Sequence, residues 1–250
     1  MKNILRALTF LTIIPIGDSL SFDEERLASS MSYFPLVGLL IGLLIALSYY
    51  LLSLIFQKTL SLWLTIGLLA FITRGFHLDG FADTIDGLFS FGSKKKILEV
   101  MKDSRIGAFG VLGLIFLIVA KYLALEQLTN KSLYNSLILM PVLGRNAMVL
   151  VCYRSPYARS EGGLAKPFTK NLRIKEVIIS SSLTFCISLF LMGLKGMVVF
   201  LAIALFAFLY RLFFIKRLGG ITGDILGAAN ESSELLCLLI LVILINFENL

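Results

Sequence analysis

The sequence predicts an all-α, polytopic integral membrane protein, and its composition and the lengths of its apolar runs both indicate this class. Apolar residues make up 58% of the 250 residues, charged residues only 16%, and the mean hydropathy is +0.90. Soluble domains usually carry about a quarter charged residues. The length fits a single domain over residues 1–250, and no stretch has the composition of a soluble domain or a linker.

The apolar runs predict six to seven transmembrane helices. A helix needs roughly 20 apolar residues to cross the hydrocarbon core. Six runs reach or nearly reach this length and a seventh is shorter: residues 31–56, 60–76, 106–128, 132–152, 176–194, 196–214 and 235–247. The first run, Ile4 to Ile16, is too short to span. It follows Lys2 like a signal peptide, but no A-x-A-type cleavage site comes after it. We therefore expect a retained short helix there, interfacial or re-entrant.

Basic residues concentrate in alternate connections between these runs. The three long connections rich in Lys and Arg are residues 77–105, 153–175 and 215–233. The other three connections hold only Lys58, Lys131 and Lys195. Cytoplasmic loops of membrane proteins collect Lys and Arg, so we expect the N-terminus and the long loops on the cytoplasmic side of the cell membrane. The bilayer thus accounts for the net charge of +7, and we expect no nucleic-acid partner.

One long connection opens with a cluster of acids, HLDGFADTIDG, at residues 77–87. Asp79, Asp83 and Asp86 fall on one stripe of a helix at 100° per residue. Three carboxylates on one stripe repel each other unless a cation lies among them, and hard oxygen ligands suit Mg²⁺ or Mn²⁺. The pattern therefore predicts a metal site. The alternative is a solvated helix face in a cytoplasmic loop.

Small and aromatic neighbours accompany these acids. Gly80 and Gly87 lie beside the stripe, where the absence of side chains lets another backbone or a ligand approach closely. His77, which is the only histidine, falls on the opposite face. It is a candidate hydrogen-bonding partner or proton carrier at a catalytic site. The alternative is an interfacial residue that fixes the loop.

A second acidic group lies near the C-terminus, in GGITGDILGAANESSE at residues 219–234. Asp224, Glu231 and Glu234 would lie within about 80° of each other on a helix. Together with the first group they could bind two divalent ions that clamp a phosphoryl displacement. A one-metal site, with a spare carboxylate acting as the catalytic base, fits the sequence equally well.

Basic candidates follow the first acidic group in KDSRIGAFG, residues 102–110. Lys102 and Arg105 precede a predicted helix N-terminus, and together these features suit a phosphate. An ordinary positively charged flank of a membrane span would have the same composition.

Two further regions carry basic residues that could contact a substrate. Arg145 lies inside an apolar segment, where an ionisable residue is a functional candidate; a side chain that extends to the interface is the alternative. Arg159 and Lys166 lie in the glycine-containing connection 153–170, which could hold an anionic, aromatic substrate. That connection could equally be only the longest positively charged loop.

The motifs together resemble the cobalamin synthase family, also called adenosylcobinamide-GDP ribazoletransferase. They occur in this order: HLDGFADTIDG, KDSRIGAFG, Arg145, YARSEGGLAKPF and GGITGDILGAANESSE. The resemblance covers essentially the whole chain. It implies an Mg²⁺-dependent enzyme of the cytoplasmic membrane that completes cobalamin (vitamin B12). A ribose hydroxyl of α-ribazole, or of its 5′-phosphate, attacks the phosphorus bonded to cobinamide in adenosylcobinamide-GDP. GMP leaves, and adenosylcobalamin or its 5′-phosphate forms.

The resemblance also suggests roles for the candidate residues. We expect the three aspartates of residues 77–87 to hold Mg²⁺ against the diphosphate. An acid of residues 219–234 would hold a second ion or take the ribose proton, and the basic residues would neutralise phosphate. The sequence leaves open the preferred lower-ligand substrate, the number of metal ions and the identity of the base. It also leaves open homo-oligomerisation and contacts with other enzymes of cobalamin assembly.

Two rival functions fit the sequence less well. Enzymes resembling CDP-alcohol phosphotransferases also hold metal with aspartates in a membrane helix, but their D-G-x-x-A-R order is not met. Asp79-Gly80 is followed by Phe81-Ala82-Asp83 without an arginine. A divalent-cation transporter would carry acids on both membrane faces, whereas the predicted spans place them at one face.

Overall fold

The computed structural model describes residues 2–14 and 23–246, and this part of the chain is helical apart from turns and one isolated β-bridge. The all-α prediction is therefore confirmed. The helices are α1 (Lys2–Leu11), α2 (Glu24–Ser30), the 3₁₀ helix η1 (Met31–Tyr33), α3 (Phe34–Ser53), α4 (Lys58–Ile72), α5 (Phe76–Phe89), α6 (Lys94–Val100), α7 (Ala108–Gln127), α8 (Asn130–Cys152), α9 (Lys166–Asn171), α10 (Ile174–Met192), α11 (Leu194–Leu218) and α12 (Gly223–Asn246).

Among the described residues, six helical segments are long and apolar enough to cross a membrane, and a bent helix pair makes a seventh candidate. The six are Glu24–Ser53, Ala108–Gln127, Lys131–Cys152, Ile174–Met192, Leu194–Leu218 and Gly223–Asn246. The bent pair is α4 with α5. The prediction of six to seven spans in a multi-pass membrane protein is confirmed.

The junction between α4 and α5 corrects the predicted span 60–76 and the predicted loop 77–105. Helix α4 ends at Ile72, and the chain bends by 89° before α5 begins. Gly75 takes the left-handed conformation (φ 64°) that a residue without a Cβ adopts most easily. The backbone N–H of Ile13 donates to the carbonyl of Ile72 at 2.8 Å. The acids made this segment too polar for a predicted span, but as α5 it packs against α7 and α12.

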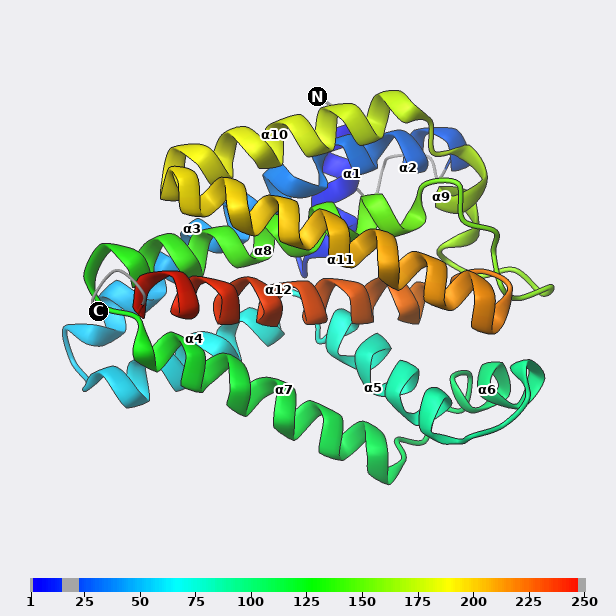
Figure 1. Cartoon of the computed structure of the whole chain (residues 1–250), viewed down its shortest axis with the longest axis horizontal. Helices are drawn as coiled ribbons and strands as arrows, with labels where there is room; N and C mark the ends of the chain where they lie inside the picture. The colour runs from blue at the N-terminus through cyan, green and yellow to red at the C-terminus, as the bar shows by residue number, and fades with distance from the viewer. Residues whose placement is uncertain (1, 15–22, 247–250) are drawn as a thin grey trace.

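Helix α12 corrects the predicted loop 215–233 in the same way. Gly219 (φ 71°) ends α11, and α12 begins at Gly223. All three acids of the second group therefore lie within a 24-residue helix and not in a loop. In Figure 1, α12 runs through the middle of the molecule, and it contacts α5, α7, α8 and α11.

The long polar connections gather at one end of the helix bundle. Figure 1 shows α6, α9 and the α11–α12 turn at the right of the view. The connections α3–α4, α7–α8 and α10–α11 lie at the left. The predicted alternation between short and long connections is therefore seen in space, and we call the right-hand end the polar end.

The short N-terminal helix packs into the bundle. Helix α1 ends at Leu11, while Ile16, the predicted end of this apolar run, lies outside the described residues. The ring of Phe10 contacts the rings of Phe34, Phe76 and Phe168, with centroids 5.0–6.1 Å apart. Helix α1 thereby connects α3, α5 and α9 near the α4–α5 bend.

Candidate functional site

The first acidic group meets Asp224 of the second group where α5 crosses α12. A Cβ at Gly80 would lie 2.9 Å from both the Cα and the carbonyl oxygen of Asp224, so the two backbones are in contact there. The close approach predicted for Gly80 is confirmed. Asp79 is exposed and Asp83 half-buried on α5. The negative charges of Asp79, Asp224 and Asp86 all act on Asp83. This crossing is the strongest candidate site in the described part of the chain.

Replacing Gly80 by Ala should separate the two helices. The new methyl group would overlap backbone atoms of Asp224, which have no flexible side chain with which to yield. We expect the variant to lose about 1–3 kcal/mol of stability, measured as a lower melting temperature in detergent. Gly67→Ala is the matched control, because a Cβ at Gly67 would meet nothing within 4 Å. Equal melting temperatures for the two variants would contradict the tight crossing.

Asp86 holds α5 against the start of α7. Its carboxylate accepts the backbone N–H groups of Gly107 and Gly110 at 2.7 and 2.8 Å. A negative charge at a helix N-terminus is favourable. A Cβ at either glycine would overlap this carboxylate. The predicted anion position before α7 is therefore filled by a side chain of the protein itself, which gives Asp86 a positioning role. Its role as a metal ligand remains a prediction.

Arg159 links the segment before α9 to the acids. Its guanidinium donates to Asp224 at 2.7 Å and to the carbonyl of Met101 at 3.2 Å. The β-bridge between Tyr157 and Ile221 fixes this segment beside the start of α12. The sequence identified Arg159 and Asp224 as separate candidates, and the structure brings them together.

Glu231 and Glu234 lie apart from Asp224, in a buried ion cluster. Lys121 contacts Glu231 at 2.6 Å and Glu234 at 2.7 Å, and Arg145 also pairs with Glu234. The Asn230 amide donates to both carboxylates at 3.1 Å. Two cations thus balance two anions within the span region. Glu231 and Glu234 are engaged in structural ion pairs, and this argues against the predicted role of either as a free catalytic base.

The same cluster changes the interpretation of Arg145 and adds a residue that the sequence analysis missed. Arg145 has 0% exposure, so its side chain does not extend to the interface. Its partner is Glu234, which leaves the predicted phosphate contact without support from the geometry. Lys121 was not identified, although a lysine inside the apolar run 106–128 was a usable signal.

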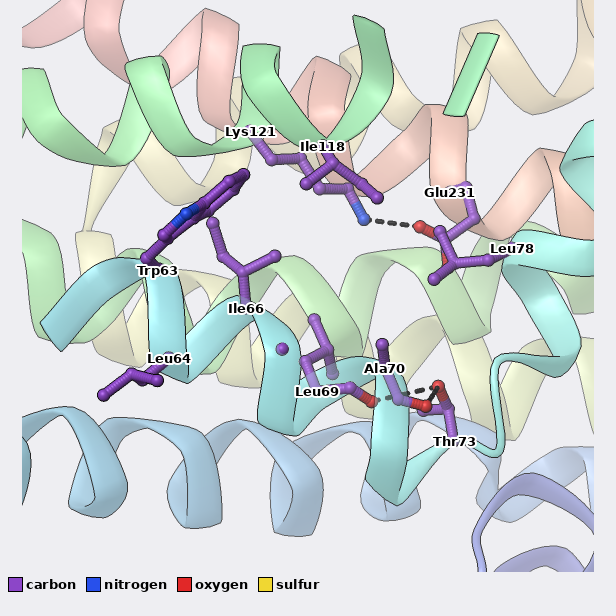
Figure 2. Close-up of a pocket in the computed structure, with 11 residues that line it drawn as sticks. Trp63, Leu64, Ile66, Leu69, Ala70, Thr73, Leu78, Ile118, Lys121 and Glu231 are labelled. Carbon is purple, nitrogen blue, oxygen red and sulfur yellow. Dashed lines mark hydrogen bonds and ion pairs between the residues drawn. The ribbon is translucent and has the colours of Figure 1, made fainter. Parts of the chain in front are cut away.

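Figure 2 shows where this cluster borders a pocket of about 260 Å³ between α4, α5, α7 and α12. Lys121 and Glu231 face each other at one side of the pocket, and apolar residues such as Trp63 and Ile66 form the rest of its wall. Trp63 itself is 48% exposed, so the pocket borders the outer surface of the bundle.

His77 lies on the side of α5 that faces this ion cluster. It is 1% exposed, and a Cβ at Gly227 would lie 3.2 Å from its Cα. The charges of Arg145, Glu234 and Lys121 act on its ring. Within the described residues neither ring nitrogen has a hydrogen-bond partner. His77 is therefore packed inside the bundle, and both its catalytic role and the alternative of fixing the loop remain predictions.

The other predicted basic residues lie exposed at the polar end. Lys102 pairs with Glu161, and its hydrogen bond lowers the pKa of that carboxyl. Arg105 pairs with Asp103 at 2.7 Å, and this hydrogen bond lowers the pKa of Asp103 to about 2. Lys166 begins α9 and is exposed. Lys102 lies in the same groove as Arg159. Arg105 binds a neighbour two residues away.

The acids of α5 have the chemistry of a magnesium site that a substrate completes. In residues 2–14 and 23–246, no group of three or more His, Cys, Asp or Glu side chains converges as a metal site. Mg²⁺, however, is commonly held by only one or two carboxylates together with waters and substrate phosphates. Asp79 and Asp83 provide two carboxylates that are exposed or half-buried, near the pair of Asp224 with Arg159. They therefore fit the predicted ion.

Comparisons with known proteins agree with these motifs. Residues 3–242 match the protein family described as cobalamin-5-phosphate synthase. An adenosylcobinamide-GDP ribazoletransferase of Alkaliphilus metalliredigens is 41% identical over 98% of this chain and 96% of its own length. A protein of the same name from Clostridium novyi is 38% identical over 97% of each chain. No solved structure matches the chain significantly. The chain therefore belongs to the cobalamin-5-phosphate synthase family.

Proposed function

We propose that the protein joins adenosylcobinamide-GDP to α-ribazole, or to its 5′-phosphate, and releases GMP. The observation that carries this proposal is the near full-length similarity to relatives named adenosylcobinamide-GDP ribazoletransferase, at 36–41% identity for the first three. The products are adenosylcobalamin, or its 5′-phosphate, and GMP. The reaction is therefore an attack by a ribose hydroxyl on the phosphorus next to cobinamide.

The geometry supports different roles for the residues at the α5–α12 crossing. Asp79 and Asp83 would hold Mg²⁺, which neutralises charge on the diphosphate when it is bound. Arg159 would bind phosphate oxygens at the start of α12, because its side chain, unlike that of Arg145, is partly exposed. Of the three acids of residues 219–234, Asp224 is the best candidate for taking the ribose proton. It is partly exposed at the crossing, whereas the two glutamates are buried in ion pairs.

We infer that the polar end faces the cytoplasm. The three basic connections gather there, and the positive-inside bias places such connections on the cytoplasmic side. This orientation would give the site access to nucleotide-activated substrates in the cytoplasm.

A transfer assay on detergent-purified protein tests the proposal. With both substrates and Mg²⁺ present, we expect equal amounts of GMP and complete corrinoid, separated by chromatography. When α-ribazole and its phosphate are left out, no GMP should appear, because the nucleophile is missing. GMP released without the second substrate would indicate hydrolysis, and no product from well-folded protein would refute the proposed reaction.

A further inference from the structure

The polar end contains a groove that shares Arg159 with the α5–α12 crossing. It lies between α6 and residues 158–161 and has a volume of about 700 Å³. Pockets of about 300–1,000 Å³ accommodate ligands of drug size. Its charged lining residues are Lys94, Lys95, Glu99, Lys102, Arg159 and Glu161. The groove thus has the size of a nucleotide site and an excess of positive charge.

The cations of the groove are available to an anionic ligand. The side chains of Lys95 and Lys102 are 88% and 63% exposed, and their partners Glu99 and Glu161 are exposed as well. The Lys95–Glu99 pair is loose, at 3.9 Å. Exposed ion pairs of this kind contribute little, so phosphate oxygens can replace the carboxylates. Charge-assisted hydrogen bonds from Lys and Arg are the usual means of binding phosphate.

Arg159 connects the groove to the acidic crossing. It lines the groove and also donates to Asp224 at 2.7 Å. A phosphate bound to Arg159 therefore lies beside the carboxylates that α5 and α12 bring together. The cations of the groove and the carboxylates of the crossing therefore meet at Arg159, which suits a nucleotide whose phosphates contact both.

We propose that this groove binds the guanosine nucleotide of the activated substrate and that GMP leaves through it. The phosphate attached to guanosine contacts Lys95, Lys102 and Arg159, the phosphate next to cobinamide lies beside the aspartates of α5, and the nucleoside lies along α6. This inference rests on the proposed function and assigns one of its two substrates to a surface. The cobinamide and α-ribazole portions then occupy the opposite side of the diphosphate.

Equilibrium binding of GDP to the purified full chain tests this placement without turnover. Loss of one charged contact should weaken binding about tenfold, so Lys95→Gln and Lys102→Gln should each raise the Kd for GDP by about that factor. Glu99→Gln should lower the Kd, because it removes a competing carboxylate. The control is Lys131→Gln, an exposed lysine in the first turn of α8 that does not line the groove, for which no change is expected.

The outcomes separate this inference from the proposed function. Unchanged GDP affinity in the Lys95 and Lys102 variants, or weaker binding in Glu99→Gln, would overturn the groove assignment even if the transfer assay succeeds. A wild-type protein that does not bind GDP would also overturn it. Failure of the wild-type transfer assay would instead refute the reaction, whatever the groove binds.

Discussion

Asp83→Asn is expected to lower the rate of GMP release at least about 100-fold, an effect of the size seen when a single charge-stabilising group is removed from an active site. Asp83 is half-buried on α5, and the charges of Asp79 and Asp224 act on it. An amide has nearly the size of a carboxyl group but carries no charge with which to hold a cation. The initial rate with both substrates and Mg²⁺ gives the activity, and circular dichroism in detergent confirms the helical fold.

Asp23→Asn is the matched control for this substitution. Asp23 caps α2 by accepting the backbone N–H of Glu25, and asparagine caps helices about as well as aspartate. The control should therefore keep both its fold and its rate. Normal turnover by Asp83→Asn would show that α5 does not hold the catalytic ion.

Lys121→Met is expected to cause the largest loss of stability. The side chain is 4% exposed and contacts Glu231 and Glu234, so its removal leaves two buried carboxylates facing Arg145 alone. Breaking a buried ion pair by removing one partner costs about 3–5 kcal/mol. The melting temperature in detergent should fall accordingly, with a smaller yield of folded protein.

A second substitution should recover part of this loss. In Lys121→Met/Glu231→Gln the remaining Glu234 and Arg145 balance each other, so the double variant should melt above the single variant. Lys131→Met makes the same chemical change at an exposed position and should leave stability unchanged. If the double variant is less stable than Lys121→Met, charge imbalance is not the cause of the destabilisation.

Much of the fold could be predicted from the sequence because the bilayer imposes strong constraints. The thickness of the bilayer sets the length of each span, and the positive-inside bias sets the alternation of basic connections. The helices of the structure agree with the predicted spans. The close approach at Gly80 could also be predicted, because a glycine beside an acidic stripe leaves room for another backbone, and α12 lies there.

The features that sequence analysis missed depend on contacts between distant segments. Gly75 permits the bend after α4, but the hydrogen bond that the N–H of Ile13, just beyond the end of α1, donates to Ile72 could not be read from the sequence. The hydrogen bonds from the N–H groups at the start of α7 to Asp86 are another such contact. Helical spacing also grouped Glu231 with Asp224. They lie about two turns apart along α12, where Asp224 pairs with Arg159 and Glu231 pairs with Lys121.

We propose that Asp79 and Asp83 of α5 hold the divalent ion that neutralises the diphosphate. Electron paramagnetic resonance of Mn²⁺, used in place of Mg²⁺, measures this ion directly in the presence of GDP. We predict that wild-type protein binds Mn²⁺ in a GDP-dependent manner and that Asp79→Asn/Asp83→Asn, folded to the same extent, loses this binding. Equal GDP-dependent binding of Mn²⁺ by the double variant would contradict the claim and place the ion elsewhere.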